Sequence, residues 1–346
     1  MWKPWGQAYE DLETQGPQKV KRERPFRTLH THILALMLAL AMAVVAIHFY
    51  LKAAQLNREF EEEFGPRLIT IESLTHDVSI KPIHSHNDEW RRHPLLDALR
   101  AGANSIEADC YYRESDPDTI LVGHNPSYLS RKANLDAMYL DHLFDLLKQS
   151  NAGPDSRDGK NGIFYTSPET TTYFYVDIKN NREQLLEVFQ HKLQRFLDND
   201  FLTTYNSTSD TFHEGPLTII VTGDVPYDQI SSQELVYTFI DAPLNELVDP
   251  EKAALYPANK ISLFASASLG QLTGSHKAVS LFNGLSSSQL ADLDKFIKAA
   301  HSINLKTRIW DTPKFTKAIK HKVWKQLIEL DSDYLNVDDL REAIHF

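Results

Sequence analysis

An apolar run near the N-terminus constrains this chain more than any other feature, because it sets one segment apart from any water-soluble core. The run extends from Ile33 to Leu51, and His48 is its one polar interruption. A helix needs roughly 20 apolar residues to cross the hydrocarbon core of a bilayer. A helix at the core of a soluble domain would carry a polar stripe, which this segment lacks. The sequence therefore predicts a transmembrane helix over residues 33–51.

The charges that flank this helix predict its orientation. Basic residues precede it and acidic residues follow it: Lys19, Lys21, Arg22, Arg24 and Arg27, then Glu59, Glu61, Glu62 and Glu63. By the positive-inside rule, residues 1–32 form a cytosolic tail and the remaining chain lies across the membrane. A cleaved signal peptide would have a shorter basic region, and a mitochondrial transit peptide would lack the acids Glu10, Asp11 and Glu13. We expect a single-pass signal anchor, in the secretory pathway or in a mitochondrial membrane.

Composition excludes several classes of protein. The chain has 346 residues, and its 36 Lys and Arg against 47 Asp and Glu give a net charge of −11, which argues against a nucleic-acid partner. The single cysteine, Cys110, excludes an intramolecular disulfide framework and a cysteine-based zinc site. The sequence has no Gly-x-Ser-x-Gly elbow, Walker loop or Gly-x-Gly-x-x-Gly turn, so serine-hydrolase and nucleotide-binding functions are set aside. It carries no indication of the oligomeric state.

Beyond a charged stalk over residues 52–79, short apolar strands alternate with amphipathic helices. Nine runs have the pattern of strands: Ile80–Ile83, Ser105–Cys110, Thr119–Val122, Thr172–Ile178, Leu217–Thr222, Tyr237–Ile240, Ile261–Ala265, Thr307–Trp310 and Tyr334–Val337. Helical periodicity covers Asn181–Leu197, Ser287–His301 and Thr316–Leu330. This alternation indicates a parallel sheet, and the 267 residues from 80 to 346 are close to the roughly 250 residues of a (β/α)8 barrel. We expect a TIM barrel, with one run left over as a hairpin or edge strand.

The residues with the strongest chemical signal lie near the ends of the first predicted strands. Glu107 and Asp109 are two apart in a strand, so both side chains point to one face. Two such carboxylates repel each other unless a cation neutralises them, and oxygen ligands suit Mg²⁺ or Ca²⁺. His86 follows the preceding strand and His124 ends the next, and the ends of barrel strands meet at the face that carries active sites. Two histidines beside a cation are suited to cleaving a phosphodiester.

A further strand ends in Asp177, within the sequence TTYFYVDIK. Asp177 is either a third cation ligand or an acid that caps the helix after Asn181. Lys179 lies on the same face, two residues on, and we expect it to contact phosphate.

Four segments together resemble a known family. They are HSHNDEWRRHPLLDALRAGANSIEAD (His84–Asp109), ILVGH (Ile120–His124), FYVDIKN (Phe174–Asn180) and the C-terminal region Lys306–Leu340. They resemble the phospholipase C-like phosphodiesterase superfamily, which includes glycerophosphodiester phosphodiesterases and sphingomyelinase D-like enzymes, and most closely the fungal altered inheritance of mitochondria protein 6 family. The resemblance covers essentially all of residues 80–345 and implies a role in lipid metabolism.

The resemblance also implies roles for individual residues. His86, which fits the His-Asn-Asp pattern better than His84, and His124 match the two catalytic histidines. Three acids match the metal ligands: Glu107, Asp109 and Asp177. Trp310 matches an aromatic residue that lines the pocket, and Asn87 stands where many glycerophosphodiesterases have an arginine that holds phosphate. We therefore expect Asn87, Lys179 and Trp310 to contact the substrate.

The sequence is consistent with three functions. The preferred one is a membrane-anchored, Mg²⁺- or Ca²⁺-dependent phosphodiesterase that acts on a phospholipid or a glycerophosphodiester. A metal-dependent amidohydrolase is suggested by His84-Ser85-His86, but the later histidines fall in predicted helices, loops or the tail. A non-catalytic barrel that binds a lipid headgroup or a protein partner is the remaining alternative.

Overall fold

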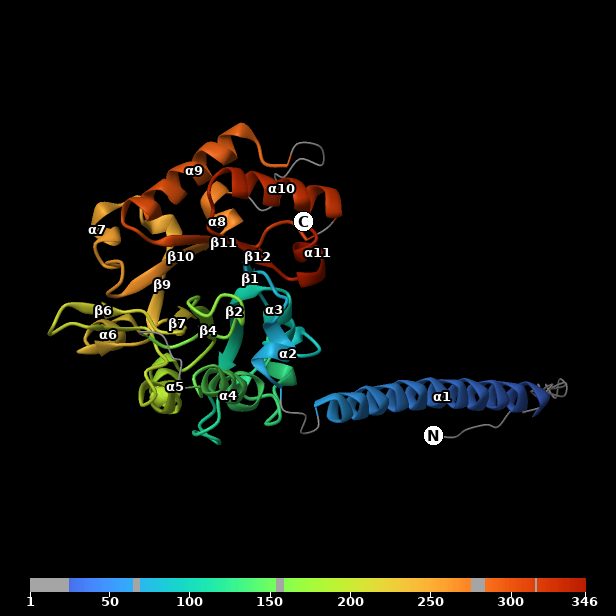
Figure 1. Ribbon diagram of the computed structural model, residues 1–346. Coiled ribbons are helices and arrows are strands. Elements are labelled where there is room, and N and C mark those ends of the chain that lie inside the picture. Colours follow the sequence, from blue (N-terminus) through green and yellow to red (C-terminus); the bar gives the residue numbers. More distant parts are fainter. Residues whose placement is uncertain (1–24, 65–68, 154–158, 275–283, 315) are drawn as a thin grey trace, which may run out of the picture. The chain divides into compact units, whose positions relative to one another are not determined.

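The computed structural model describes residues 25–64, 69–153, 159–274, 284–314 and 316–346 (Figure 1). The chain divides into two compact units, Met1–Leu68 and Ile69–Phe346. The helix α1, Pro25–Phe64, is the described part of the first unit. Within α1, residues His32–Lys52 are long and apolar enough to cross a membrane, and none of that segment is buried. It contains the predicted transmembrane run 33–51, whereas residues 1–24, with most of the basic group, lie outside the described residues.

The second unit is a closed barrel of eight parallel strands, which confirms the predicted fold class. Its sheet has the order β1-β12-β11-β10-β9-β7-β4-β2, and β1 pairs with β2 to close it. The strand bounds are β1 Lys81–Ser85, β2 Ala103–Tyr111, β4 Thr172–Ile178, β7 Leu217–Gly223, β9 Phe239–Pro243, β10 Ser262–Ser268, β11 Lys306–Trp310 and β12 Tyr334–Val337. Each corresponds to one of the predicted runs.

The ninth predicted run is the short strand β3, Leu121–Val122, which pairs antiparallel with β2 outside the barrel. It is the one run of the nine that was expected to form a hairpin or an edge strand outside the barrel. A second, three-stranded sheet was not predicted; it consists of β5 Thr204–Asn206, β6 Thr211–His213 and β8 Leu235–Val236. Its strands have only two or three residues, too few to give a periodic signal.

Helices follow most of the barrel strands and surround them (Figure 1). The three predicted ones are α5 Arg182–Leu197, α9 Ser287–Ser302 and α10 Lys317–Glu329. The others are shorter: α2 Ile71–Thr75, α3 Leu96–Arg100, α4 Asp141–Ser150, α6 Tyr227–Ser231, α7 Pro250–Ala253, α8 Leu269–Thr273, α11 Leu340–Ile344, and the single turns η1 Asp88–Trp90, η2 Pro126–Tyr128, η3 Asp136–Leu140 and η4 Leu244–Glu246.

The last part of the expected stalk belongs to the barrel unit. Thr70 caps α2 through a reciprocal pair of hydrogen bonds with Ser73. The helix buries Ile71 and Leu74 and contacts α3 and α4. Residues 52–79 therefore divide between the end of α1 and the beginning of the compact unit.

Inside the barrel, aromatic side chains fill the end at which the strands begin, and polar side chains line the carboxyl ends of the strands. The outward residues of β2, Ile106, Ala108 and Cys110, are fully buried, as the sequence predicted. Inside, Tyr173, Phe264 and Tyr334 contact one another edge to face, with ring centroids 4.9–6.0 Å apart. The inward residues that follow them along the strands are polar, so the carboxyl ends of the strands carry the ionisable groups.

Candidate active site

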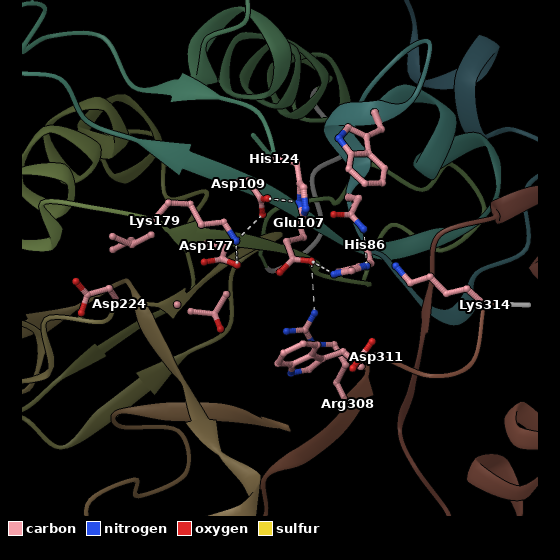
Figure 2. A pocket seen from close by; sticks show the side chains of 16 residues that line it. His86, Glu107, Asp109, His124, Asp177, Lys179, Asp224, Arg308, Asp311 and Lys314 are labelled. Carbon is pink, nitrogen blue, oxygen red and sulfur yellow. Dashed lines mark hydrogen bonds and ion pairs between the residues drawn. The ribbon is translucent and has the colours of Figure 1, made fainter. Parts of the chain in front are cut away.

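A cavity of about 630 Å³ opens at the carboxyl ends of the barrel strands (Figure 2). Ligand sites of TIM barrels lie at this face. All eight site residues predicted from the sequence line it: His86, Asn87, Glu107, Asp109, His124, Asp177, Lys179 and Trp310. His84, the alternative to His86, is fully buried and does not line it.

Three carboxylates converge at one point of the cavity. Asp109 and Asp177 are register partners on neighbouring strands β2 and β4, and Glu107 precedes Asp109 on the same face. Glu107, Asp109 and Asp177 each offer an oxygen within 4.8 Å of the other two. An all-oxygen donor set at this spacing fits a hard divalent cation such as Mg²⁺ or Ca²⁺. The N-cap residue of α5 is Asn181, and the side chain of Asp177 accepts a hydrogen bond from Lys179 in the cavity.

Lys179 neutralises two of these acids. Its Nζ lies 2.5 Å from Asp177 Oδ2 and 3.1 Å from Asp109 Oδ1 (Figure 2). Burial opposes the charge of Lys179, but Asp177 and Asp109 outweigh it and raise its pKa. Burial, together with the charge of Glu107, raises the pKa of Asp177 to about 6. The charged amine of Lys179 therefore pairs with the two aspartates. It lies inside the cavity in which we expect it to contact phosphate.

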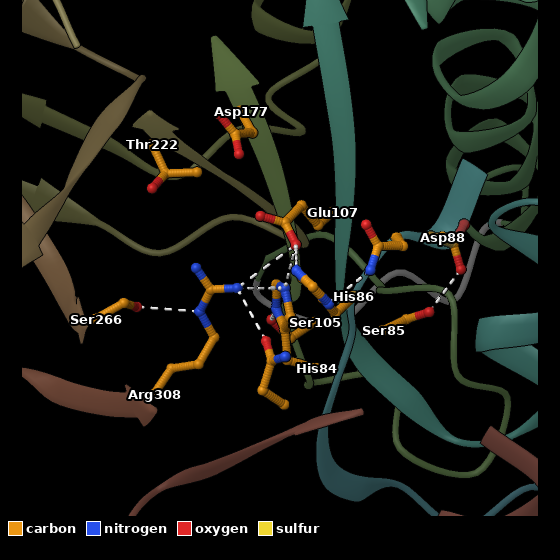
Figure 3. A network of polar contacts seen from close by, with 12 residues as sticks. His84, Ser85, His86, Asp88, Ser105, Glu107, Asp177, Thr222, Ser266 and Arg308 are labelled. Atoms are coloured by element: carbon orange, nitrogen blue, oxygen red, sulfur yellow. Dashed lines mark hydrogen bonds and ion pairs between the residues drawn. The ribbon is translucent and has the colours of Figure 1, made fainter. Parts of the chain in front are cut away.

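The third acid, Glu107, is paired with a buried arginine that was not among the residues predicted from the sequence. Arg308 on β11 is buried, with Nη1 3.6 Å from Glu107 Oε2 (Figure 3). Its Nη2 lies 3.3 Å from Asp241 Oδ2. Burial alone would favour the neutral acid, but the charge of Arg308 holds the pKa of Glu107 well below its ordinary value. Burial and Arg308 lower the pKa of His84 to about 3, so its Nε2 accepts a hydrogen bond of 2.7 Å from Arg308. The carboxylate pair of β2 is thus already partly neutralised by the protein.

Each of the two predicted histidines is held by a carboxylate. His86 Nδ1 lies 2.6 Å from Asp338 Oδ1, and His124 Nδ1 lies 3.0 Å from Asp109 Oδ2. A carboxylate only accepts hydrogen bonds, so each Nδ1 carries the proton and each Nε2 is left to exchange one. Asn87 Nδ2 donates to the same Asp338 oxygen at 3.0 Å. Asp338 is partly buried, but its contacts with His86 and with a nearby lysine hold its pKa below the ordinary value.

The route by which His124 reaches the cavity differs from the prediction. We expected His124 to end a barrel strand, but β3 runs antiparallel to β2 and belongs to a hairpin. The hairpin turns the chain back along β2, and the Gly123 N–H donates to the Asp109 carbonyl at 3.0 Å. His124 therefore arrives beside Asp109 from outside the barrel, with its side chain 49% exposed. Trp90 covers its ring, with centroids 4.7 Å apart.

Sequence reasoning missed four ionisable residues of this region. Arg308 is an arginine at the centre of an otherwise buried strand, which is itself a signal, because a buried charge requires a partner. Asp241 is likewise a charged residue in an otherwise apolar strand, in the sequence FIDAP. Asp338 directly follows the last barrel strand, in the sequence NVDD. Glu89, in HNDEW, had no distinguishing pattern. Both of its carboxylate oxygens are shielded from solvent with no hydrogen-bond partner, and burial together with Asp109 raises its pKa to about 8.

Comparison with known proteins gives consistent matches. The family described as AIM6-like phosphodiesterase domain matches residues 72–241. Altered inheritance of mitochondria protein 6 of Eremothecium gossypii is 33% identical over 293 residues, 82% of this chain and 74% of that protein. The proteins of the same name from Saccharomyces cerevisiae S288c and Candida glabrata are 34% and 33% identical, over 82% and 80% of this chain and 75% and 73% of theirs. No solved structure shows a significant match.

Proposed function

Since the chain belongs to the altered inheritance of mitochondria protein 6 family, with its phosphodiesterase-type domain, we propose that it hydrolyses phosphodiesters with a divalent cation and two histidines. The single observation that carries this proposal is the placement of two histidines at the three-carboxylate cluster, within one cavity. His86 Nε2 lies 3.8 Å from Glu107 Oε2, and His124 Nδ1 lies 3.0 Å from Asp109 Oδ2. Each histidine has a carboxylate at Nδ1, the arrangement that general acid–base catalysis requires.

The two histidines have opposite roles in this reaction. One Nε2 removes the proton from the attacking hydroxyl or water, and the other protonates the oxygen of the departing alcohol. Asp338 and Asp109 hold the rings in the tautomer that leaves Nε2 unprotonated in the base. Because both histidines keep the same Nδ1 partner throughout, neither has to rotate between the two halves of the reaction.

Glu107, Asp109 and Asp177 would hold the cation, and Mg²⁺ or Ca²⁺ at that point supplies positive charge to the phosphate oxygens. Lys179 also lines the cavity, and with a cation held by the two aspartates its ammonium group would be available to the phosphate. Lys314, whose Nζ lies 2.8 Å from Asp338 Oδ2, provides a second cation at the opposite wall. These two lysines substitute for the arginine that Asn87 replaces.

The substrate is a phospholipid or a glycerophosphodiester, and we propose that α1 anchors the enzyme to a membrane. The 21 residues of His32–Lys52 have the length and composition of a single span. Under the positive-inside rule the barrel lies on the side opposite the basic N-terminal tail. Attachment to a bilayer would give the cavity access to lipids without a soluble carrier.

Turnover by the full chain in detergent micelles tests the proposal. We expect hydrolysis of bis-(p-nitrophenyl) phosphate and of lysophospholipids that requires Mg²⁺ or Ca²⁺ and stops with a chelator. His86→Ala and His124→Ala should each lower kcat by roughly 10²–10⁴ on the lipid. The variant that lacks the general acid should lose much less on the p-nitrophenyl ester, because that leaving group departs without a proton.

Two results would contradict the proposal. One is an absence of cation-dependent turnover on every phosphodiester tried. The other is full activity of His86→Ala on the lysophospholipid, whose leaving group requires a proton. Binding of a phospholipid headgroup without hydrolysis, unaffected by Asp109→Asn, would establish the non-catalytic barrel instead.

A further inference from the structure

We propose that Glu89, Asp109 and His124 form a second metal site, selective for Zn²⁺, that is distinct from the three-carboxylate cluster. These three residues each present one ligand atom within 4.8 Å of the others. They come from three different parts of the chain, namely the turn η1, the barrel strand β2 and the loop after β3. The two sets share Asp109 and no other residue.

The carboxylate of Glu89 has unused hydrogen-bond acceptors that a bound cation would occupy. Its carboxylate lies within 4.8 Å of ligand atoms of Asp109 and His124. Among the described residues, neither of its oxygens has a hydrogen-bond partner or measurable solvent exposure. Shielded polar atoms are nearly always hydrogen-bonded, so a shielded and unpartnered carboxylate is an exception that needs a physical reason. The proposed function gives Glu89 no task. A cation bound against Asp109 and His124 would occupy both of its unused acceptors.

The donor atoms favour zinc over the hard cations. Glu107, Asp109 and Asp177 offer only oxygen, which suits Mg²⁺ and Ca²⁺. The second set replaces one oxygen by an imidazole nitrogen. Zn²⁺ binds such mixed nitrogen and oxygen sets in tetrahedral geometry, with three protein ligands and a water as a common arrangement. His124 Nδ1 and Asp109 Oδ2 are already 3.0 Å apart, close to the roughly 3.3 Å that two ligands of a tetrahedral zinc ion keep.

The site is positioned to switch the enzyme off, a consequence that rests on the proposed function. A zinc-bound imidazole has no second lone pair with which to pass a proton, so His124 would cease to act as acid or base. Zinc would also draw Asp109 away from the three-carboxylate cluster. Because the two sets share this residue, each cation lowers the affinity of the protein for the other. We therefore expect free Zn²⁺ to inhibit turnover.

Zinc binding to the full chain in detergent micelles tests the site without reference to turnover. Isothermal titration calorimetry with Zn²⁺ alone should detect a tight binding event in the wild type. Glu89→Gln removes one ligand with little change of shape and should weaken that event at least about tenfold. Asp177→Asn, which alters only the three-carboxylate cluster, should retain it. Glu114→Gln, at an exposed acid outside both sets, is the matched control.

Two further measurements secure the assignment. Co²⁺ in place of Zn²⁺ should give the intense visible absorption of a four-coordinate ion in the wild type and in Asp177→Asn, and lose it in Glu89→Gln. His124→Gln should lose the same event, which decides the question if Glu89→Gln fails to fold. Inhibition by Zn²⁺, normalised to the zinc-free activity of each protein, should also be weaker in Glu89→Gln.

The site is refuted if Glu89→Gln or His124→Gln, folded as judged by circular dichroism, binds zinc as tightly as the wild type. It is also refuted if Asp177→Asn loses the event to the same extent as Glu89→Gln, since the zinc would then occupy the three-carboxylate cluster. A protein that binds zinc as described but hydrolyses no phosphodiester would retain this site and overturn only the proposed function.

Discussion

Replacing Arg308 by Met should destabilise the barrel more than any other single charge removal in this region. Met fills much of the same space but leaves Glu107 and Asp241 buried without their cation. Removing one partner of a buried ion pair costs about 3–5 kcal/mol, because the remaining charge is left uncompensated in a poorly polarisable interior. With a denaturant dependence of about 3 kcal/mol/M, the urea midpoint should fall by roughly 1–1.7 M.

The pH dependence of this effect follows from the pKa of Glu107. In the wild type that pKa lies below its ordinary value, so ionised Glu107 stabilises the fold above pH about 4.3 and this stabilisation is lost as the pH falls. Without Arg308, burial dominates and the ionised form destabilises the fold instead. The difference in the free energy of unfolding between the two proteins should therefore be largest near pH 7 and shrink toward pH 4.

Urea unfolding of the full chain in detergent micelles, followed by tryptophan fluorescence at pH 7 and pH 4.5, measures this difference. The matched control is Arg182→Met, since Arg182 also pairs with two acids, Glu183 at 2.8 Å and Asp224 at 3.2 Å, but at the surface. That control should leave the midpoint unchanged within error. A midpoint for Arg308→Met within 0.3 M (about 1 kcal/mol) of the wild type, or a loss that does not depend on pH, would refute the reasoning.

Three further predictions concern the site and the anchor. Asp338→Asn should lower kcat/KM by roughly 10²–10⁴, because an amide can donate to His86 Nδ1 and so favours the wrong tautomer. Binding of Mg²⁺ should release about half a proton at pH 6 and almost none at pH 8, because Asp177 has a pKa of about 6 and must ionise to bind; calorimetry in buffers of different ionisation enthalpy measures this. Replacing both Leu40 and Val44 by Arg should release the protein from membranes in alkaline carbonate, since each arginine at the centre of a span costs about 2.5–3.5 kcal/mol.

These predictions have simple controls. Asp339→Asn changes the neighbouring acid, which caps α11 and does not contact His86, and should retain activity. Asp177→Asn should abolish the proton release at pH 6, and an equal release at pH 8 would contradict the assignment. For the anchor, exchanging Leu40 and Val44 for Ile should keep the protein in the membrane pellet, and a wild type already soluble in carbonate would contradict the span.

The periodic parts of the fold could be predicted from sequence, and the non-periodic parts could not. In the strand Thr172–Ile178 the apolar residues Phe174 and Val176 mark one face, so Asp177 was placed correctly on the other, inward face. β3 has two residues and no period, so the direction from which His124 enters was assigned wrongly. The pairing of Arg308 with Glu107 joins residues about 200 positions apart, and only barrel closure brings them together. Local patterns carry no information about such contacts.

The central claim is that a divalent cation is held by three acids between the two histidines. Anomalous diffraction from crystals of the full chain grown with Mn²⁺ tests it most directly. We predict a peak with one oxygen each of Glu107, Asp109 and Asp177 at about 2.0–2.6 Å, and with Lys179 displaced from the two aspartates. A map without that peak, in which Lys179 still bridges Asp109 and Asp177 at saturating Mn²⁺, would contradict it.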